Sequence, residues 1–528
     1  MFERVHSWTG LLAGLALFIA FYAGAFTVFH DDLERWQQPR AETAATNVWS
    51  DAESLIQGVV TRFPESRKQI SLRIPGTPDE DLVAYWFDGK EYQQRTPAQM
   101  KTAPAASAHE PHDLAQFLYE LHYDLAIPEV GIYLMGVVSV IYALALITGV
   151  LLYLPGLTRD IFALRAGRNL KRLWQDAHNV IGVLSLPFHI IFALTGAIFC
   201  LSNIALLLFN VLVFKGQLID AAERTTGYAP SVEARGIKAD AMLTPQAVVE
   251  RARAAVKERG GLPFEADYLR YRNYGDVAAT VEAYGDSDGA LASSGAVAMN
   301  AADGTLLNVQ AAGTRDVNHA AYSVMYGMHF GHFGQYTVRW LYFILGISGA
   351  FLFYSGNLLW IESRRNRRTT QQSVGSFVMA RVTVGVCIGT CVGVSAAFLA
   401  TLIAAAFGAT SDGVVIPVFA VTMAACIAWA FFRAPVRAAV SLLVVAAILT
   451  AAVPLTEVSL SLANIRPAIL RGDAISLWTA FIALVLAVGF AMLARATAAR
   501  ARNGDSNSVW AGQVSSSRVE RVRLPEPS

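Results

Sequence analysis

The segment Trp174–Phe199 reads WQDAHNVIGVLSLPFHIIFALTGAIF, and it decides the class of fold. From Ile181 to Phe209 the chain is apolar enough to cross a bilayer, since a spanning helix needs about 20 apolar residues. His178 opens this run and His189 lies deeper in it. An ionisable side chain is costly to bury in a membrane and is usually kept there for function. The segment therefore predicts a membrane helix that carries functional histidines.

The rest of the chain confirms this class and excludes others. Only 16% of the 528 residues are charged, against about 25% in a soluble domain. A net charge of +1 leaves no basic excess for nucleic acid, so we expect no nucleic-acid partner. Seven further apolar runs bring the expected number of spans to eight, in an all-α polytopic membrane protein that contacts the lipid bilayer. They lie near Gly10–Phe29, Gly131–Leu154, Leu341–Ile361, Val382–Phe407, Val414–Phe432, Ala438–Val453 and Ile475–Leu493.

The distribution of lysine and arginine predicts the orientation of these spans. Cytoplasmic loops are enriched in basic residues, and every second loop here is basic. Both termini are therefore expected in the cytoplasm. The basic residues follow spans two, four, six and eight: Arg159, Arg165, Arg168, Lys171 and Arg172; Arg364, Arg365, Arg367 and Arg368; Arg433 and Arg437; Arg495, Arg500 and Arg502.

Two long polar segments, His30–Val130 and Lys215–Phe330, then face outward, and each is expected to be a small α+β domain. Both show a helical pattern followed by runs that alternate apolar and polar residues, as half-buried strands do. In the second segment Thr244 precedes Pro245 as an expected helix N-cap, and Asp303–Gly304 predicts a hairpin turn. The expected organisation is 1–30, 31–130, 131–214, 215–330, 331–368, 375–497 and a disordered cytoplasmic tail at 498–528.

The ten histidines all lie at or before position 332, so the last four spans contain none. His178 and His189 are eleven residues apart, which on one helix places them on nearly the same face about 16 Å apart. They are thus too far apart to bind one metal ion, whose two axial nitrogens lie about 4 Å apart. The spans group the histidines into a cytoplasmic set, His6, His178 and the deeper His189, and an outer set, His30, His122, His329 and His332.

Paired histidines from neighbouring helices are a usual way for a bundle to bind b-type haem, and two stacked groups would carry electrons across the bilayer. Zinc is the rival metal, but the chain has no HxxxH or HExxH motif and no cysteine partner for these histidines. A histidine at a helix end is often only an interface residue. His109 and His112, in a polar stretch, are expected on the surface, and His319 is expected to be structural.

Four motifs give the chain a family resemblance that covers about its first 370 residues. They are RVHSWTGLLAGLALFIAFYAGAF at Arg4–Phe26, LHYDLAIPEVGIYLMG at Leu121–Gly136, the opening segment at Trp174–Phe199, and MHFGHFGQYTVRWLYFILGISGAFLFYSGNLLWIESRR at Met328–Arg365. With them the sequence resembles the PepSY-associated transmembrane family, which includes PiuB-type iron-regulated membrane proteins and FoxB-like ferric-siderophore reductases.

The resemblance implies PepSY-like domains in the periplasm, a place in the bacterial inner membrane, and haem b bound by histidines. Two haems would correspond to the two histidine groups. It further implies reduction of periplasmic ferric-siderophore iron. Carried over by motif, the haem-binding positions are His6, His30, His122, His178, His189, His329 and His332, with no pairing specified and with His30 just outside its motif.

The electron donor is expected to be external, either a quinone or a cytoplasmic reductase, because the cytoplasmic loops have no glycine fingerprint for FAD or NADPH. Two other functions fit the same sequence. One is a siderophore permease or accessory binding protein, and the other is a PepSY-type regulatory membrane protein without redox activity.

Overall fold

The computed structural model describes residues 1–37, 47–76, 82–101, 113–154, 169–218, 228–229, 232–409, 411 and 413–511. The chain forms two compact units. Unit 1 comprises Met1–Ala23, Leu144–Leu186 and Ser348–Ser528, and unit 2 comprises Gly24–Ala143 and Pro187–Ile347. The boundaries between the units fall inside helices, so some membrane helices contribute residues to both units.

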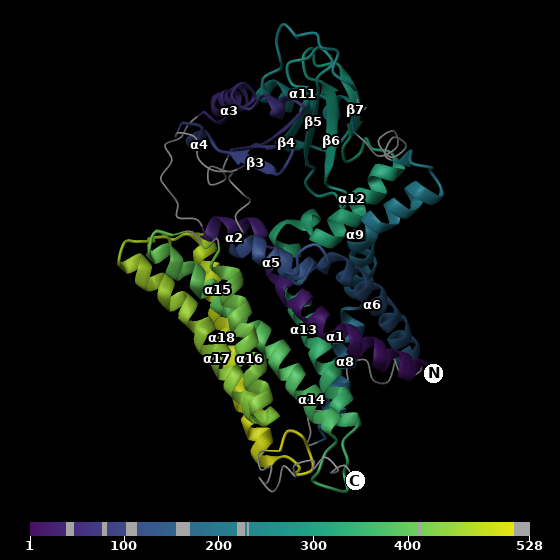
Figure 1. The fold of residues 1–528 in the computed structure, drawn as a ribbon, viewed down its shortest axis with the longest axis vertical. Coiled ribbons are helices and arrows are strands. Elements are labelled where there is room, and N and C mark those ends of the chain that lie inside the picture. Colours follow the sequence, from purple (N-terminus) through teal and green to yellow (C-terminus); the bar gives the residue numbers. More distant parts are fainter. Residues whose placement is uncertain are drawn as a thin grey trace, which may run out of the picture. The chain divides into compact units, whose positions relative to one another are not determined.

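Eight helical segments among the described residues are long and apolar enough to cross a membrane, which confirms the predicted fold class (Figure 1). They are α1 (Phe2–Thr27), α6 (Gly131–Tyr153), α9 (Leu186–Leu212), α13 (Gln335–Ser363) with the short η3 (His332–Gly334) before it, α14 (Val374–Thr383) continued by η4 (Val384–Ile388) and α15 (Gly389–Ala406), α16 (Val415–Phe432), α17 (Pro435–Leu462) and α18 (Ala474–Asn503).

The third predicted span is two helices in the structure. Helix α8 (Leu170–Leu184) ends at Ser185, whose amide and hydroxyl both donate to the carbonyl of Ile181. Helix α9 starts at Leu186, and its second residue, Pro187, has no amide hydrogen to continue the ladder of α8. His178 and His189 therefore lie on different helices. The prediction that they share one helix face is wrong. The turn at Ser185 separates the two helices, so the regular rotation per residue does not continue from His178 to His189.

The first span also differs from its prediction, Gly10–Phe29. Helix α1 begins at Phe2, so His6 is inside the helix rather than before it. Backbone hydrogen bonds extend the helix through polar residues that hydropathy excludes. At the other end α1 stops at Thr27, and a separate helix, α2 (His30–Gln37), begins with His30. His6 and His30 are thus not two ends of one helix.

The described strands of both polar segments form one antiparallel sheet of seven strands in unit 2, in the order β3-β2-β1-β4-β5-β6-β7. Strand β1 of the first segment pairs with β4 of the second, with Leu72 opposite Leu269. The sequence predicts two separate domains, but the structure joins their strands in one sheet. The pairing of β1 with β4 leaves neither strand exposed at an edge of the sheet. The strands are β1 (Gln69–Arg73), β2 (Val83–Phe87), β3 (Tyr92–Arg95), β4 (Glu265–Arg272), β5 (Thr280–Asp286), β6 (Gly295–Asn300) and β7 (Leu306–Gln310).

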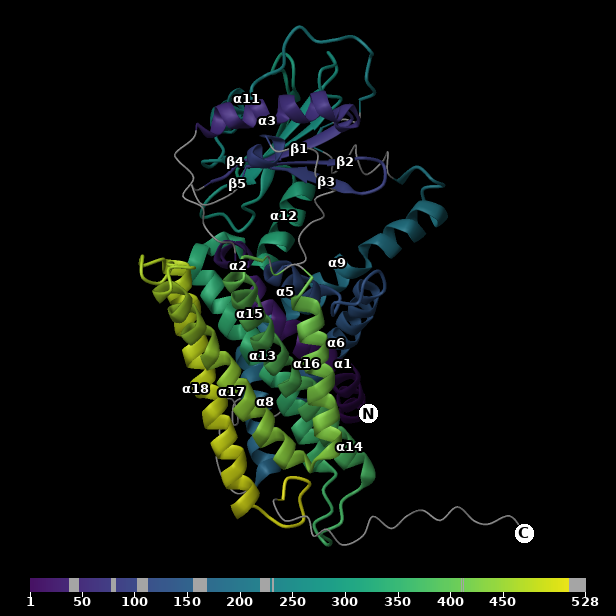
Figure 2. The same cartoon turned by 60° about the vertical axis from the view of Figure 1, so that its left-hand side comes forward.

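Helices α3 (Val48–Arg62) and α11 (Pro245–Glu258) cover one face of this sheet (Figure 2). Thr244 caps α11 as predicted, because its hydroxyl oxygen accepts a hydrogen bond from the amide of Ala247. We call the sheet with these two helices the sheet domain. Its core is continuous across both segments and includes Ile56, Val59, Leu72, Val256, Leu269 and Val281. Smaller helices in unit 2 are η1 (Pro64–Arg67), α4 (Pro97–Lys101), α5 (Leu114–Tyr123) and α12 (Val317–Phe330).

The C-terminal helices of unit 1 pack side by side, and α17 contacts both α15 and α18 (Figure 1). The expected disorder from position 498 is wrong for the described part of the tail. Helix α18 continues to Asn503, and Val509 packs with Leu358 and Ile361. Arg365 donates to the backbone carbonyl of Asn507. Residues 512–528 lie outside the described residues.

Candidate functional site

Unit 1 contains one pair of histidines, His6 from α1 and His178 from α8, whose ring centres lie 6.1 Å apart. Nδ1 of His6 lies 2.9 Å from the carbonyl oxygen of Ala145, and Nδ1 of His178 lies 3.1 Å from that of Leu352. A carbonyl oxygen can only accept, so each Nδ1 carries the hydrogen of the neutral ring. The lone pair is then on Nε2, which is the nitrogen available to a metal ion.

Glycines let both rings of this pair approach a helix backbone closely. A Cβ added at Gly149 of α6 would lie 2.9 Å from Cε1 of His6. One added at Gly356 of α13 would lie 3.3 Å from Cε1 of His178. Any larger residue at Gly149 would displace the imidazole, because carbon atoms do not approach within 3.0 Å.

Unit 2 contains a second pair, His122 from α5 and His329 from α12, with ring centres also 6.1 Å apart. The hydroxyl of Thr195 donates to the carbonyl of Ile191, so its oxygen accepts from Nδ1 of His329 at 2.7 Å. His329 thus has the same tautomer as the pair in unit 1. A Cβ at Gly24 would lie 2.5 Å from Nδ1 of His122, so a glycine supports this pair too.

Aromatic side chains surround the imidazole of His329. The rings of Phe192, Phe199 and Phe330 lie with their centres 4.9, 5.1 and 5.1 Å from it. These side chains exclude water from one side of the pair. An apolar surrounding of this kind favours the neutral imidazole over its cation.

Two further histidines predicted as ligands lie among aromatic residues. His189 is fully buried on α9, and its Nδ1 lies 2.5 Å from the hydroxyl of Tyr142. The ring of His332 packs against Tyr326 and Phe330, each with ring centres 5.7 Å away.

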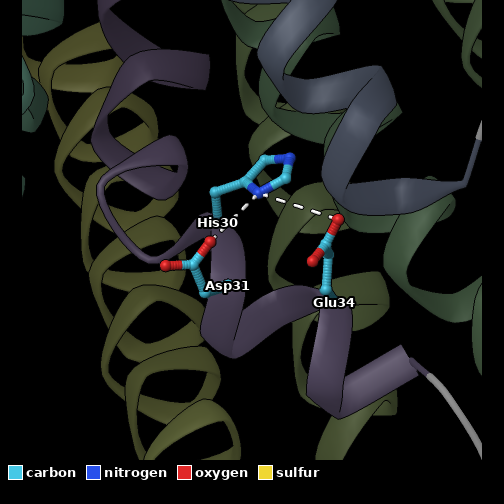
Figure 3. A group of neighbouring side chains, drawn as sticks. All are labelled: His30, Asp31 and Glu34. Atoms are coloured by element: carbon cyan, nitrogen blue, oxygen red, sulfur yellow. Dashed lines mark ion pairs between the residues drawn. The ribbon is translucent and has the colours of Figure 1, made fainter. Parts of the chain in front are cut away.

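His30 begins α2 beside two carboxylates (Figure 3). Its Nδ1 lies 3.6 Å from Oδ1 of Asp31 and 4.0 Å from Oε1 of Glu34. Burial lowers the pKa of His30, but Asp31 and Glu34 outweigh it and raise the pKa above its ordinary value. The imidazole lowers the pKa of Asp31 to about 2, and burial raises that of Glu34. These three residues therefore form a cluster in which the charge of each group affects the pKa of the others.

The remaining histidines have other surroundings. Nδ1 of His319 lies 2.8 Å from Oδ2 of Asp316, and its ring packs against Tyr228. Both contacts agree with the predicted structural role. His109 and His112 lie outside the described residues, so their predicted surface position has no test in the structure.

Several residues of the site were not predicted from the sequence. Gly149, Gly356 and Thr195 come from helices other than those of their histidines, and nothing in their own sequence surroundings points to them. Asp31 and Glu34 could have been found, because the run HDDLE places a carboxylate one and four residues after His30.

Comparison with known proteins gives a family and one weak relative. The relative is "Uncharacterized protein PA4219" of Pseudomonas aeruginosa, which is 27% identical over 260 residues. The match covers 47% of this chain and 63% of the relative, so the chain spans less than two thirds of that protein's length.

The family model described as the PepSY-associated TM region matches residues 3–363. This range contains both histidine pairs and the sheet domain. It ends with α13, before the four C-terminal membrane helices. The chain belongs to the PepSY-associated TM region family.

Proposed function

We propose that this protein is a haem b oxidoreductase of the bacterial inner membrane, which passes electrons across the bilayer and reduces the iron of a periplasmic ferric siderophore. The observation that carries the proposal is the presence of one close histidine pair in each unit, His6 with His178 and His122 with His329. These four histidines would hold the haem groups.

The donor set of both pairs fits haem. In each pair, two imidazole nitrogens would hold one haem, which requires the two rings to lie close together. Both pairs have a separation of 6.1 Å. Three of the four rings are fixed by Nδ1 hydrogen bonds, at His6, His178 and His329, which leaves Nε2 as the ligating atom.

The protein's own residues bind and tune the cofactor. When bound, haem b supplies one-electron transfer at its iron, and this chemistry belongs to the cofactor. The carbonyls of Ala145 and Leu352 hold two of the imidazoles in one tautomer and increase their basicity as ligands. Thr195 does the same for His329, and the three phenylalanines around that ring lower the local dielectric constant.

The substrate follows from the chemistry of iron chelates and from the family resemblance. Hard oxygen ligands bind Fe(III) much more tightly than Fe(II), so transfer of one electron to the bound Fe(III) releases the metal from its siderophore. The electron comes from an external donor, a quinone or a cytoplasmic reductase. The basic residues after the even-numbered spans support cytoplasmic termini, which places the sheet domain in the periplasm under this proposal.

The spectrum of the purified protein tests the proposal. Protein from haem-replete cells is expected to show a Soret band that shifts on reduction with dithionite, and a pyridine haemochrome assay is expected to give two haems b per chain. A folded, monodisperse protein without colour would contradict the proposal and favour a permease or a regulatory protein.

Variants test the assignment of the pairs. His178→Ala and His329→Ala are each expected to lose about half of the haem, because each removes one ligand from a different pair, and the double variant is expected to lose nearly all of it. His319→Ala is the matched control, since this histidine pairs with Asp316. If His189→Ala lost as much haem as His329→Ala, the ligands in unit 2 would have to be reassigned.

A further inference from the structure

The first five residues of α2 bring together three side chains that belong to neither histidine pair. We propose that His30, Asp31 and Glu34 form a binding site for a divalent transition-metal cation, in which ferrous iron is the physiological occupant. Only the choice of ferrous iron rests on the proposed function, since Fe(II) is the product of that reaction.

The three donor atoms already converge. Nδ1 of His30, a carboxylate oxygen of Asp31 and a carboxylate oxygen of Glu34 all lie within 4.8 Å of one another. In Figure 3 both carboxylates point toward the imidazole from the same helix. Ligands about 2.1 Å from a metal lie about 3.0 Å apart in octahedral and about 3.4 Å apart in tetrahedral geometry. The Nδ1–Oδ1 distance of 3.6 Å and the Nδ1–Oε1 distance of 4.0 Å need only a small closure of side chains to reach these values.

The third acidic residue of the helix shows that this convergence is selective. Asp32 is next to Asp31 in sequence, but it faces another side of α2. Its carboxylate accepts hydrogen bonds from Arg35 at 2.6 Å and from Tyr336 at 2.9 Å, and it forms an ion pair with Arg339 at 3.4 Å. Asp32 is thus engaged in holding α2, and the carboxylates directed at His30 are those of positions 31 and 34.

The surroundings keep the donor atoms in place. Arg73 lies 3.7 Å from Oε2 of Glu34, on the carboxylate oxygen that does not face His30. The ring of Tyr119 packs edge-on against the imidazole with ring centres 5.8 Å apart. One contact orients a ligand carboxylate and the other orients the ligand ring, as outer contacts do in known metal sites.

The donor set selects the class of ion. One imidazole nitrogen with two carboxylate oxygens suits Fe(II), Mn(II), Co(II) or Zn(II), and lacks the thiolates that copper(I) prefers. The side chains of His30, Asp31 and Glu34 are 29%, 54% and 32% exposed, so water can complete the coordination. A site open to water, with Arg73 offsetting part of its negative charge, is suited to an ion that binds and leaves again.

Manganese(II) is the probe for the test, because its free ion gives a six-line electron paramagnetic resonance signal that disappears on binding. Detergent-purified full-length protein is titrated with Mn(II) alone. We expect about one ion bound per chain, and at least a tenfold loss of affinity in His30→Ala, Asp31→Asn and Glu34→Gln. The last two keep the side-chain shape, so folding does not limit the result. Binding unchanged in all three would overturn the site.

Asp32→Asn is the matched control for charge, since it removes the same charge one residue away from Asp31, and the asparagine keeps a side-chain oxygen that can accept the hydrogen bonds from Arg35 and Tyr336 that hold α2. An equal loss of affinity in this control would show that α2 attracts the ion by charge alone, and would overturn the site. Anaerobic Fe(II) added in competition is expected to displace Mn(II). Failure of Fe(II) to compete would overturn the assignment of ferrous iron.

The haem content of the same samples separates this inference from the proposed function. A haem-free protein that binds one Mn(II) through these residues would refute the reductase and keep the cation site. Loss of haem in Glu34→Gln equal to that in His178→Ala would instead place α2 in the haem site and overturn the inference.

Discussion

At the scale of single residues, the tautomer of three of the four paired histidines is fixed by a neighbour from another helix. The carbonyls of Ala145 and Leu352 take the Nδ1 hydrogens of His6 and His178, and the oxygen of Thr195 takes that of His329. A carbonyl on a membrane helix is available in this way only where a side chain can reach the backbone. Gly149 and Gly356 provide that access for His6 and His178.

Gly149 gives a direct test of this packing. Gly149→Ala puts a methyl group 2.9 Å from Cε1 of His6, so the ring must move and its hydrogen bond to Ala145 is expected to weaken. Under the proposed function the variant loses about half of the haem and shows an altered spectrum for the remainder. Pyridine haemochrome and reduced-minus-oxidised spectra measure both effects.

Gly10→Ala is the control for this experiment. Gly10 lies on the same helix as His6, but a Cβ there would meet no described atom within 4 Å. We expect it to retain the wild-type haem content. If Gly149→Ala also retained full haem with an unchanged spectrum, the close approach of His6 to α6 would have no role in binding.

At the scale of elements, the two polar segments depend on each other for their structure. Strand β1 pairs with β2 of its own segment and with β4 of the other, and α3 and α11 share one core. The turn after β4 is held by Asp276, whose carboxylate accepts hydrogen bonds from the amides of Ala278, Arg235 and Gly236. It thereby ties the preceding loop to the β4–β5 hairpin.

The direction in which pH changes the stabilisation of this loop by Asp276 can be predicted. The amide of Ala278, together with those of Arg235 and Gly236, lowers the pKa of Asp276 below its ordinary value of 3.8. A group with a lowered folded pKa stabilises the fold above its unfolded pKa, and this stabilisation is lost as the pH falls through the folded value. Asp276→Asn is therefore expected to destabilise the loop near neutral pH, and to differ less from wild type at about pH 3.

Hydrogen exchange of the loop amides, followed by mass spectrometry and compared between variant and wild type at each pH, measures this effect. The amides of Arg235 and Gly236 are expected to exchange faster in the variant near neutral pH. A difference that stayed constant from neutral to acid pH would show that the charge of Asp276 has no part in holding the loop.

At the scale of the whole molecule, the exposure of apolar side chains distinguishes helices inside a unit from those that face lipid. In the most apolar window of α14–α15, 72% of the residues are buried, against 17% for α18. Helix α15 therefore occupies the interior of unit 1, while α18 exposes large residues such as Val488 and Met492. In water this exposed surface would be unfavourable, so the distribution agrees with a lipid environment.

Cysteine labelling tests the proposed orientation in the membrane. The four native cysteines are buried, so new ones can be placed on this background. Asp288→Cys, exposed in the sheet domain, is expected to react with a membrane-impermeant maleimide in intact spheroplasts. Ser506→Cys, exposed after α18, is expected to react only after the membrane is opened. The reverse pattern would invert the topology and with it the direction of electron transfer.

The eight spans and the class of fold are determined by the sequence alone, because hydropathy and length are local properties that survive any packing of the helices. The helix cap at Thr244 and the strand runs are local in the same sense. The sequence also predicts that the histidines are functional, since the free-energy cost of burying them in an apolar segment is independent of their neighbours.

Tertiary structure alone decided which histidines meet. His6 contacts His178, and His122 contacts His329, through helices that are far apart in the chain. Spacing along one helix placed His178 and His189 on nearly the same face, about 16 Å apart, and the turn at Ser185 removes that relation. Likewise β1 found its partner β4 in the other segment. Pairing depends on how helices and strands lie against one another, and periodicity within a segment contains no information about its neighbours.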